Sequence, residues 1–575
     1  MKRRRLQQGG SLLILMCVLL IAGAGVMLYP LASPQAHQRA EDAATDAALA
    51  DAKAALLGYA ATTPMENRST GNLLCPDITG NGIAWNTGNG CAGAANQGLR
   101  LGRVPWRTLG VPEARDASGE RLWYAVSDNF RSFQPATSHS ETSGTITVRD
   151  ANGQLLYDAS IGQGVAAVII APGPPLASPR LQKRPSNTAA DYLDIARGED
   201  NASFQDGSTN GFIHGPVRAS DGNLIMNDRM VVITRDELLA VIEKRFAAEV
   251  RNCLVAWAEI NHDQFPAPVP IESTDAIGID GALFGKVPVK ISRNYAQLTA
   301  LSINRLQSAR SQFANATPQN VRAATLAISR ANKSLIQTTS AVATNALLLK
   351  SLTGAALQDK IIATGVDAMI TTPQGSVSAS SLALNSAWQS AIASGYDNLA
   401  TLASQAVSYA TTASKAADAL LQKSTASGIN SVNTNTDAAL SLAAGLMLFD
   451  RTAQVAIQWP TTPNCSWLDP TQNSAWAMNQ WQRHLYYQID QPQLIRDSNG
   501  NAAAGALSIN GRAGWQLVVI AAGRALAHQN RSTLTPAQLF EGDNAHASRA
   551  GGGLFSVKNF AQKPMGDNFN DQLAY

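Results

Sequence analysis

The chain of 575 residues contains a series of short segments that occurs twice in the same order. The first series is LWYAV at 122–126, RDANG at 149–153, GVAAVIIAPG at 164–173, GEDNA at 198–202 and NDRMVV from Asn227; the second is LYYQI at 485–489, RDSNG at 496–500, GWQLVVIAAG at 514–523, GDNA at 542–545 and NDQLAY from Asn570. Five matches in one order, whose spacings differ only in loops, predict a duplicated module. Its apolar runs have the length and β-branched content of buried strands, and the polar Gly-rich connections favour antiparallel pairing.

Each copy of the module follows a predicted amphipathic helix. The first helix is expected at 40–61, after Pro30 and Pro34 interrupt the chain. The second begins at Thr234, which forms a T-x-x-E capping box with Glu237. Apolar residues then recur at helical spacing, at Leu238, Ile242, Phe246, Val250, Cys253, Trp257 and Ile260. A long helix packed on an antiparallel sheet is therefore the expected plan of each module.

A segment of different composition, residues 290–450, separates the second helix from the second series. Heptad-like seams run from 321 to 349 and from 388 to 420, and Ala, Gly or Thr occupies many of their positions. Such seams bury little apolar area each, which favours an antiparallel bundle of several helices over one free coiled coil. A hairpin turn is expected at 371–375. The inserted bundle is either a spacer or an exposed head that contacts a partner.

The N-terminus combines a basic leader with a long uncharged run. Residues 10–31 carry no charged side chain, and at ~1.5 Å per residue 22 helical residues cross a bilayer core of ~30 Å. Four cations at 2–5 place the preceding residues in the cytoplasm and predict export of the remainder. The alternative is a cleaved signal peptide, with an apolar region at 12–21 and the A-x-A-like site Ala22-Gly23-Ala24.

Four of the five cysteines lie outside the uncharged run. An even number is typical of disulfides in an oxidising compartment. Cys75 and Cys91 bracket a Gly- and Asn-rich loop that one bridge would close, and two buried free thiols are the alternative. Cys253 and Cys465, if paired, would join the second helix to the start of the second sheet; free thiols remain the alternative here as well.

No catalytic signature is present in the chain. Its seven histidines lack zinc-ligand spacing, and there is no H-E-x-x-H, G-x-S-x-G, P-loop or dinucleotide fingerprint, so we expect a protein that is not an enzyme. A net charge of +3 without a concentrated basic face predicts no nucleic-acid binding. Asp77, Thr79 and Asn81 match the first half of an EF-hand loop, but Gly88 stands where a glutamate is needed. They are a weak calcium candidate beside an ordinary Asx turn, and no other cofactor is expected.

The leader RRRLQQG followed by GSLLILMCVLLIAGAGVMLY resembles the class III leader of type IV pilins and type II secretion pseudopilins. LLCPDITGNG at 73–82 and GRVPWRTLGVPEARDASGERLWYAVS at 102–127 are similar to the periplasmic part of pseudopilin-like proteins. The resemblance implies that a prepilin peptidase cuts after Gly9, which leaves Gly10 as the N-terminus and Ile14 as the fifth residue. Most family members carry glutamate at that fifth position, so Ile14 implies a minor subunit, placed at a filament tip.

These observations together predict an α+β fold, with an N-terminal transmembrane helix followed by two tandem pilin-like modules, the second interrupted by an all-α helical bundle. The predicted domains are a leader at 1–9, a transmembrane helix at 10–31, a first module at 32–233, the helix and start of the second module at 234–289, the helical insertion at 290–450 and the remainder of the second module at 451–575.

The expected function is that of a membrane-anchored structural subunit of a type IV pilus or type II secretion pseudopilus. Its expected partners are other pilin or pseudopilin subunits, the prepilin peptidase and the bacterial inner membrane. Its N-terminus would be cytoplasmic and its bulk periplasmic or in an extracellular filament. The alternative is an exported adhesin or interaction protein with a simple anchor or a cleaved Sec signal.

Overall fold

The computed structural model describes residues 16, 34–85, 91, 100–132, 138–177, 179–203, 211–261, 263–273, 278, 282–288, 291–350, 369–372, 375–378, 386–446, 454–457, 459–460, 463–469, 474–497, 500–532, 534–546, 548–549, 555–566 and 568–575. Two compact units divide the chain near residue 239. The first holds most of 1–239, and the second holds 240–575 together with the short segments 64–68 and 139–141.

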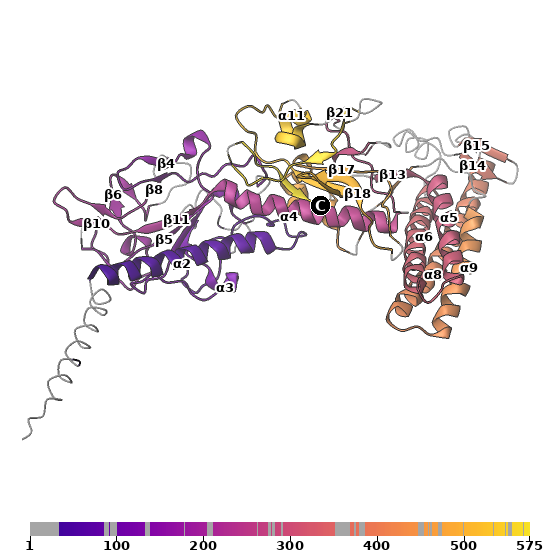
Figure 1. Ribbon diagram of the computed structural model, residues 1–575, viewed down its shortest axis with the longest axis horizontal. Coiled ribbons are helices and arrows are strands. Elements are labelled where there is room, and N and C mark those ends of the chain that lie inside the picture. Colours follow the sequence, from indigo (N-terminus) through magenta and orange to yellow (C-terminus); the bar gives the residue numbers. More distant parts are fainter. Residues whose placement is uncertain are drawn as a thin grey trace, which may run out of the picture. The chain divides into compact units, whose positions relative to one another are not determined.

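The first unit is built on a long helix and a four-stranded antiparallel sheet. Helix α2 (Pro34–Thr62) packs against strands β5 (Ala167–Ala171) and β11 (Arg229–Ile233), as Figure 1 shows. The sheet order is β1-β2-β5-β11, with β1 at Leu101–Arg103 and β2 at Trp123–Val126. Every residue of β2 and β5 is buried, because both faces of the sheet are covered. The helix begins earlier than predicted, since Pro34 is tolerated in the first helical turn, where its missing N–H is not needed.

Smaller elements complete the first unit. A three-stranded sheet combines an antiparallel hairpin with a parallel third strand, and its members are β4 (Leu155–Tyr157), β3 (Val148–Arg149) and β8 (Phe212–Ile213). The remaining elements are α3 (Trp106–Leu109), β6 (Ile195–Ala196), β7 (Glu199–Asp200), β9 (Val217–Arg218) and β10 (Leu224–Met226).

The second unit contains a sheet with the same plan. Its order is β12-β17-β20-β24, all antiparallel, and the strands are β12 (Phe284–Lys286), β17 (Leu485–Ile489), β20 (Leu517–Ala521) and β24 (Gln572–Ala574). A three-stranded sheet again joins an antiparallel hairpin to a parallel strand, here β18 (Gly505–Ile509) with β19 (Arg512–Gly514) and β23 (Asn559–Phe560). The unit also contains the short elements α10 (Ala475–Met478), α11 (Pro536–Leu539), β21 (Ser548–Arg549) and β22 (Phe555–Ser556).

Helix α4 (Arg235–Ile260) carries the predicted apolar stripe, and most of it belongs to the second unit. Thr234 and Glu237 exchange hydrogen bonds at its start, as a capping box requires. The stripe from Leu238 to Trp257 is almost completely buried. Aromatic side chains such as Phe246 and Trp257 occupy this face, whereas the buried face of α2 carries Leu49, Ala52, Leu56 and Ala60.

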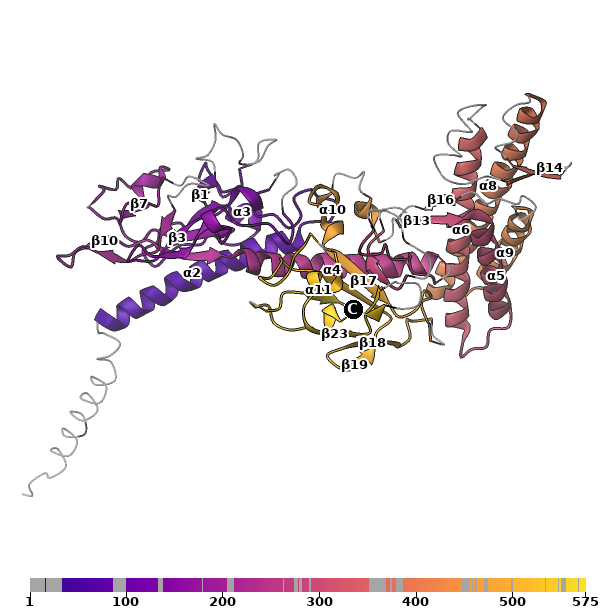
Figure 2. The ribbon, with the colours of Figure 1, turned by 90° about the horizontal axis from the view of Figure 1, so that it is seen from above.

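Four helices between β12 and β17 form a bundle, which both ribbon views show side by side (Figures 1 and 2). They are α5 (Tyr295–Ala314), α6 (Val321–Lys350), α8 (Ser386–Gln422) and α9 (Ala426–Leu446). Two short ribbons accompany them, β13 (Ile291–Asn294) with β16 (Gln454–Ile457), and β14 (Met369–Thr372) with β15 (Gly375–Ser378).

The packing of α8 differs from the predicted seam by one step around the helix. Tyr409, which the seam places inside, is 43% exposed. Ala406 and Ala413 of the predicted seam are buried, but its Leu402, Tyr409 and Ala416 are replaced in the interior by Ala403, Ala410 and Ala417. Alanine allows the closest approach of neighbouring helices, so the small residues take the interior and the larger ones move to its edge.

The predicted fold class is wrong. No helix of the part of the chain that the structure describes is long and apolar enough to cross a membrane. Of the predicted transmembrane segment 10–31, only Met16 is among the described residues. The described chain is a mixed α and β structure, in which two four-stranded sheets, several two- and three-stranded sheets and a helical bundle are combined.

Candidate functional site

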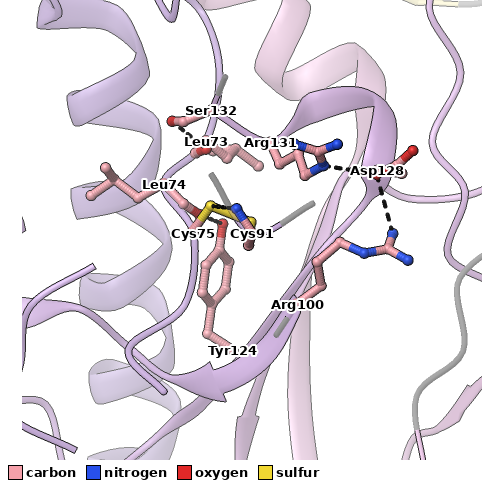
Figure 3. Close-up of a disulfide and its surroundings, with 9 residues drawn as sticks. All are labelled: Leu73, Leu74, Cys75, Cys91, Arg100, Tyr124, Asp128, Arg131 and Ser132. Carbon is pink, nitrogen blue, oxygen red and sulfur yellow. Dashed lines mark hydrogen bonds and ion pairs between the residues drawn. A yellow bond between two sulfur atoms is a disulfide. The ribbon is translucent and has the colours of Figure 1, made fainter. Parts of the chain in front are cut away.

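The first disulfide, Cys75–Cys91, closes a 16-residue separation at the edge of the first unit's sheet (Figure 3). Both cysteines are buried, and their Cα atoms are 5.6 Å apart. The hydroxyl of Tyr124 donates to the carbonyl oxygen of Leu74 at 2.9 Å, and that of Ser132 donates to Leu73 at 2.9 Å. The segment before Cys75 is therefore held both by β2 and by the loop that follows it.

Charged residues border the same disulfide. Arg131 contacts the Asp128 carboxylate at 2.8 Å, and Arg100 approaches it to 3.8 Å, as Figure 3 shows. Both guanidinium groups are nearly buried. They fix the turn after β2 rather than presenting free charge, because both share one carboxylate.

The second disulfide, Cys253–Cys465, joins α4 to the chain that leads into β17. It spans 212 residues, so the whole bundle lies inside the covalent loop. Aromatic rings surround this junction: Phe246 of α4 stacks on Trp481 with ring centroids 4.5 Å apart, and Trp467 and Trp476 meet edge to face at 5.6 Å. The structure thus contains both disulfides that were considered from the sequence, Cys75–Cys91 and Cys253–Cys465.

A buried tyrosine is repeated in the two sheets. Tyr487 is the counterpart of Tyr124, and its hydroxyl donates to the carbonyl oxygen of Pro266 at 2.6 Å. Each tyrosine lies opposite a glycine of the edge strand, Gly102 or Gly285. A Cβ on these glycines would lie 2.6 Å from the Asp77 oxygen or 2.1 Å from the Val269 oxygen, so only glycine fits.

These glycines belong to a match that our sequence comparison missed. GRVP at 102–105 and GKVP at 285–288 occupy the same place in the two sheets. In each, the edge strand also exchanges backbone bonds with a preceding segment, at Asp77 or Val269. A match of four residues is short, but the shared pattern of Gly, a basic residue, Val and Pro was a usable signal.

Replacing either tyrosine with phenylalanine is expected to destabilise its own unit by about 1–3 kcal/mol, because a buried carbonyl loses its partner. Hydrogen exchange of peptides that cover β2 and β17 measures this loss for each unit separately. Tyr409→Phe is the matched control, since Tyr409 is largely exposed. If only one of the two variants lowers the protection of its own unit, the two tyrosines are not equivalent.

A buried carboxylate and an asparagine form the most elaborate repeated feature. In the first unit Asn201 donates to Asp228 at 2.8 Å and to the Ile213 oxygen at 3.0 Å, and it accepts from the Ile213 N–H at 2.9 Å. The N–H of Asp194 donates to the same oxygen of Asp228 at 2.9 Å. The Asp194 carboxylate in turn accepts from the N–H of Asn227 at 2.8 Å.

The second unit repeats this network bond for bond. Asn544 donates to Asp571 at 3.0 Å and to the Ala561 oxygen at 3.1 Å, and it accepts from the Ala561 N–H at 2.7 Å. The N–H of Glu541 donates to Asp571 at 2.9 Å, and the Glu541 carboxylate accepts from Asn570 at 3.1 Å. Both networks tie the last strand of the sheet to the parallel strand of the smaller sheet.

Two acids lie together at the centre of each network. Burial raises the pKa of Asp228 well above its ordinary value of 3.8, and the charge of Asp194 raises it further. Burial and the nearby Glu541 do the same to the pKa of Asp571. One oxygen of Asp228 and one of Asp571 have no hydrogen-bond partner among the described residues. This environment favours the neutral, protonated acid.

The RDANG and RDSNG match is not a structural equivalence. Residues 149–153 form the turn between β3 and β4, whereas 496–500 lie in the connection from β17 to β18. The turn of the equivalent hairpin, β18 to β19, contains Asn510 and Gly511 instead. Both RDxNG turns use the same local bonds, from Gly153 to Asp150 and from Gly500 to Asp497, so turn chemistry alone produced the likeness.

The calcium candidates form a closed Asx-type turn. The Asp77 carboxylate accepts from the Thr79 N–H at 3.0 Å, from the Gly80 N–H at 2.8 Å and from the Gly82 N–H at 2.6 Å. Asn81 accepts from the Ile83 N–H at 2.9 Å. Among the described residues, no three His, Cys, Asp or Glu side chains are grouped so that they could hold a metal ion.

The residues expected to decide processing and assembly, Gly9, Gly10 and Ile14, lie outside the described residues. No protein-family model, no curated protein and no solved structure matches the chain.

Proposed function

We propose that the protein is an exported, non-catalytic structural subunit of a filament of the type IV pilus or type II secretion class, and a minor component of it. The observation that carries the proposal is the leader, in which Gly9 separates a basic segment from an uncharged run of 22 residues. Two disulfides support a location outside the cytoplasm.

The repeated polar residues support a structural role. Tyr124, Asn201 and Asp228, like their counterparts Tyr487, Asn544 and Asp571, all direct their hydrogen bonds to the protein's own backbone or to one another. Groups that are buried and bonded in this way hold strands together and do not meet a substrate. The features that the two modules share are therefore those of a scaffold.

Determination of the mature N-terminus tests the proposal. The chain is expressed with and without a prepilin peptidase, and mass spectrometry of the purified protein identifies its first residue. We expect Gly10 only when the peptidase is present, and Gly9→Leu should abolish this product. Ala24→Leu is the control, because it blocks a signal-peptidase site at 22–24 without touching Gly9.

A mature chain that begins at Gly25 with or without the prepilin peptidase would contradict the proposal. It would favour instead an exported adhesin with a cleaved Sec signal. The outcome does not depend on which kind of filament the subunit serves.

A further inference from the structure

A small cavity of about 190 Å³ lies in the first unit beside the edge of its sheet. Its lining includes Asp77, Gly80, Leu101, Arg103, Trp123 and Asn187. By the volume of liquid water, ~30 Å³ per molecule, it has room for about six waters or for a small organic molecule.

Arg103 supplies a buried cation to this cavity. Its guanidinium lies between two aromatic rings, with the central carbon 4.0 Å from the Trp123 centroid and 4.1 Å from the Tyr192 centroid. One nitrogen donates to the Arg121 carbonyl oxygen at 2.8 Å, and the guanidinium also forms a side-chain hydrogen bond with Tyr192. Among the described residues, no carboxylate forms an ion pair with Arg103, which is only 7% exposed. Burial lowers the pKa of Arg103 to about 10, so the group is still charged at neutral pH.

Trp123 adds a donor that lacks an acceptor. Its indole Nε1 is buried without a hydrogen-bond partner among the described residues, and the side chain is 3% exposed. An indole can only donate. Asp77, the acid in the lining, already accepts hydrogen bonds from its own loop at both oxygens. A buried charge that no carboxylate neutralises and a buried indole N–H without an acceptor are each unfavourable unless something fills the site.

The second unit provides an internal comparison. Lys286 and Tyr486 occupy the strand positions of Arg103 and Trp123, since the two pairs face one another in the same register. Lys286 donates to the carbonyl oxygen of Ser273. The hydroxyl of Tyr486 donates to the carbonyl oxygen of Arg483 at 2.8 Å. At these two strand positions the second unit therefore satisfies its donors internally, whereas the indole N–H of Trp123 in the first unit has no acceptor among the described residues.

A larger opening in the second unit lacks this property. It measures about 690 Å³, and the arginines that line it already have carboxylate partners. Arg496 pairs with Asp263 at 3.0 Å, Arg305 pairs with the same carboxylate, and Arg330 lies 3.8 Å from Glu259. Its charges need no ligand.

We propose that the cavity of the first unit binds a small carboxylate, which accepts from the guanidinium of Arg103 and from Nε1–H of Trp123. Arginine pairs with carboxylates through parallel N–H bonds, and the aromatic rings on both sides hold the guanidinium plane in place. The carboxylate belongs to a free organic acid or to the C-terminal residue of a peptide. The inference is independent of the filament role proposed above.

The indole N–H resonance of Trp123 is the direct test. The full chain is labelled with ¹⁵N at its tryptophans, and Trp123→Phe assigns the signal. Acetate added in exchange for chloride at constant ionic strength should shift that resonance saturably, while acetamide should leave it in place. The inference is overturned if acetate at 100 times the protein concentration and above, up to about 100 mM, causes no shift, or if acetamide causes the same shift.

A variant and two peptide probes complete the experiment. Arg103→Lys, which installs the residue found in the second unit, should weaken acetate binding at least tenfold, whereas Arg107→Lys on the neighbouring helix should not. An unchanged affinity for acetate in Arg103→Lys would overturn the inference. If this variant fails to fold, the comparison of acetate with acetamide on the natural chain still tests the inference. Triglycine and its C-terminal amide separate the sources: binding of triglycine but not of the amide assigns the site to a chain end, and binding of acetate alone assigns it to a free acid.

Discussion

Replacing both Cys253 and Cys465 with alanine is expected to lower the free energy of unfolding of the second unit by about 5 kcal/mol, the largest effect expected in this molecule. The reason is the length of the closed loop, 212 residues, which restricts the unfolded chain far more than a short loop does. Cys75→Ala with Cys91→Ala opens a 16-residue separation, for which the same relation gives about 3 kcal/mol.

The two double variants are matched, because each removes two buried sulfur atoms and leaves two alanines. The cost of the cavities is thus similar, and the difference of about 2 kcal/mol reports loop length. Hydrogen exchange of peptides from β5 and from β20 gives the stability of each unit, so two-state unfolding of the whole chain is not required. A smaller loss for the long loop than for the short one would show that the bundle remains folded when its unit unfolds.

The strands were the most predictable part of the fold. LWYAV and LYYQI form β2 and β17, each the second strand of its sheet, and the runs beginning at 164 and 514 contain β5 and β20. Pairing follows the sequence match: Trp123 faces Ile170, and Tyr486 faces Ile520. A short continuous apolar run is compatible with a buried strand or a buried helix, and here the short length, the β-branched residues and the flanking glycines favour the strand.

Turn motifs were less reliable. The RDxNG pair forms the same local bonds at two places that are not equivalent, because an Asx turn depends on a few neighbouring residues and not on the sheet around it. The α8 seam was displaced for a related reason. Heptad spacing fixes a period, but the choice between adjacent faces depends on how closely neighbouring helices approach, and that favoured Ala410 over Tyr409.

No pattern along the chain predicted which aromatic rings would surround the Arg103 guanidinium. Arg103, Trp123 and Tyr192 come from three separate segments, and only the strand register and the loop before Asp194 bring them together. The buried acids were predictable in part. Both copies of the module contain the pair Asn-Asp before the last strand and the pair Asp-Asn before the parallel strand. The hydrogen bond between the asparagine and the aspartate forms where the two sheets of a unit meet, and no spacing along the chain predicts that contact.

Replacing Asp571 with asparagine is expected to change how the stability of the second unit depends on pH. The folded pKa of Asp571 is raised by burial and by Glu541, so the native protein holds a proton that the unfolded chain releases near pH 3.8. The stability contributed by this proton is fully present below that pH and is lost as pH rises through the folded pKa. Asparagine is neutral at every pH, so the stability of Asp571→Asn relative to that of the natural chain should rise as pH increases from the unfolded to the folded pKa of Asp571.

The amide keeps the oxygen that accepts from Asn544 and Glu541, so the variant is expected to fold. Unfolding by urea at several pH values from 3 to 8, followed by exchange of β24 peptides, measures the difference. Asp228→Asn should show the same trend in the first unit, since its carboxylate has the same partners. Asp543→Asn is the control: it adjoins Asn544 in the chain, but its carboxylate is 63% exposed. Parallel stability curves for Asp571→Asn and the natural chain would mean that the buried pair carries no extra proton, and the networks would then hold two charged acids stabilised by their N–H donors alone.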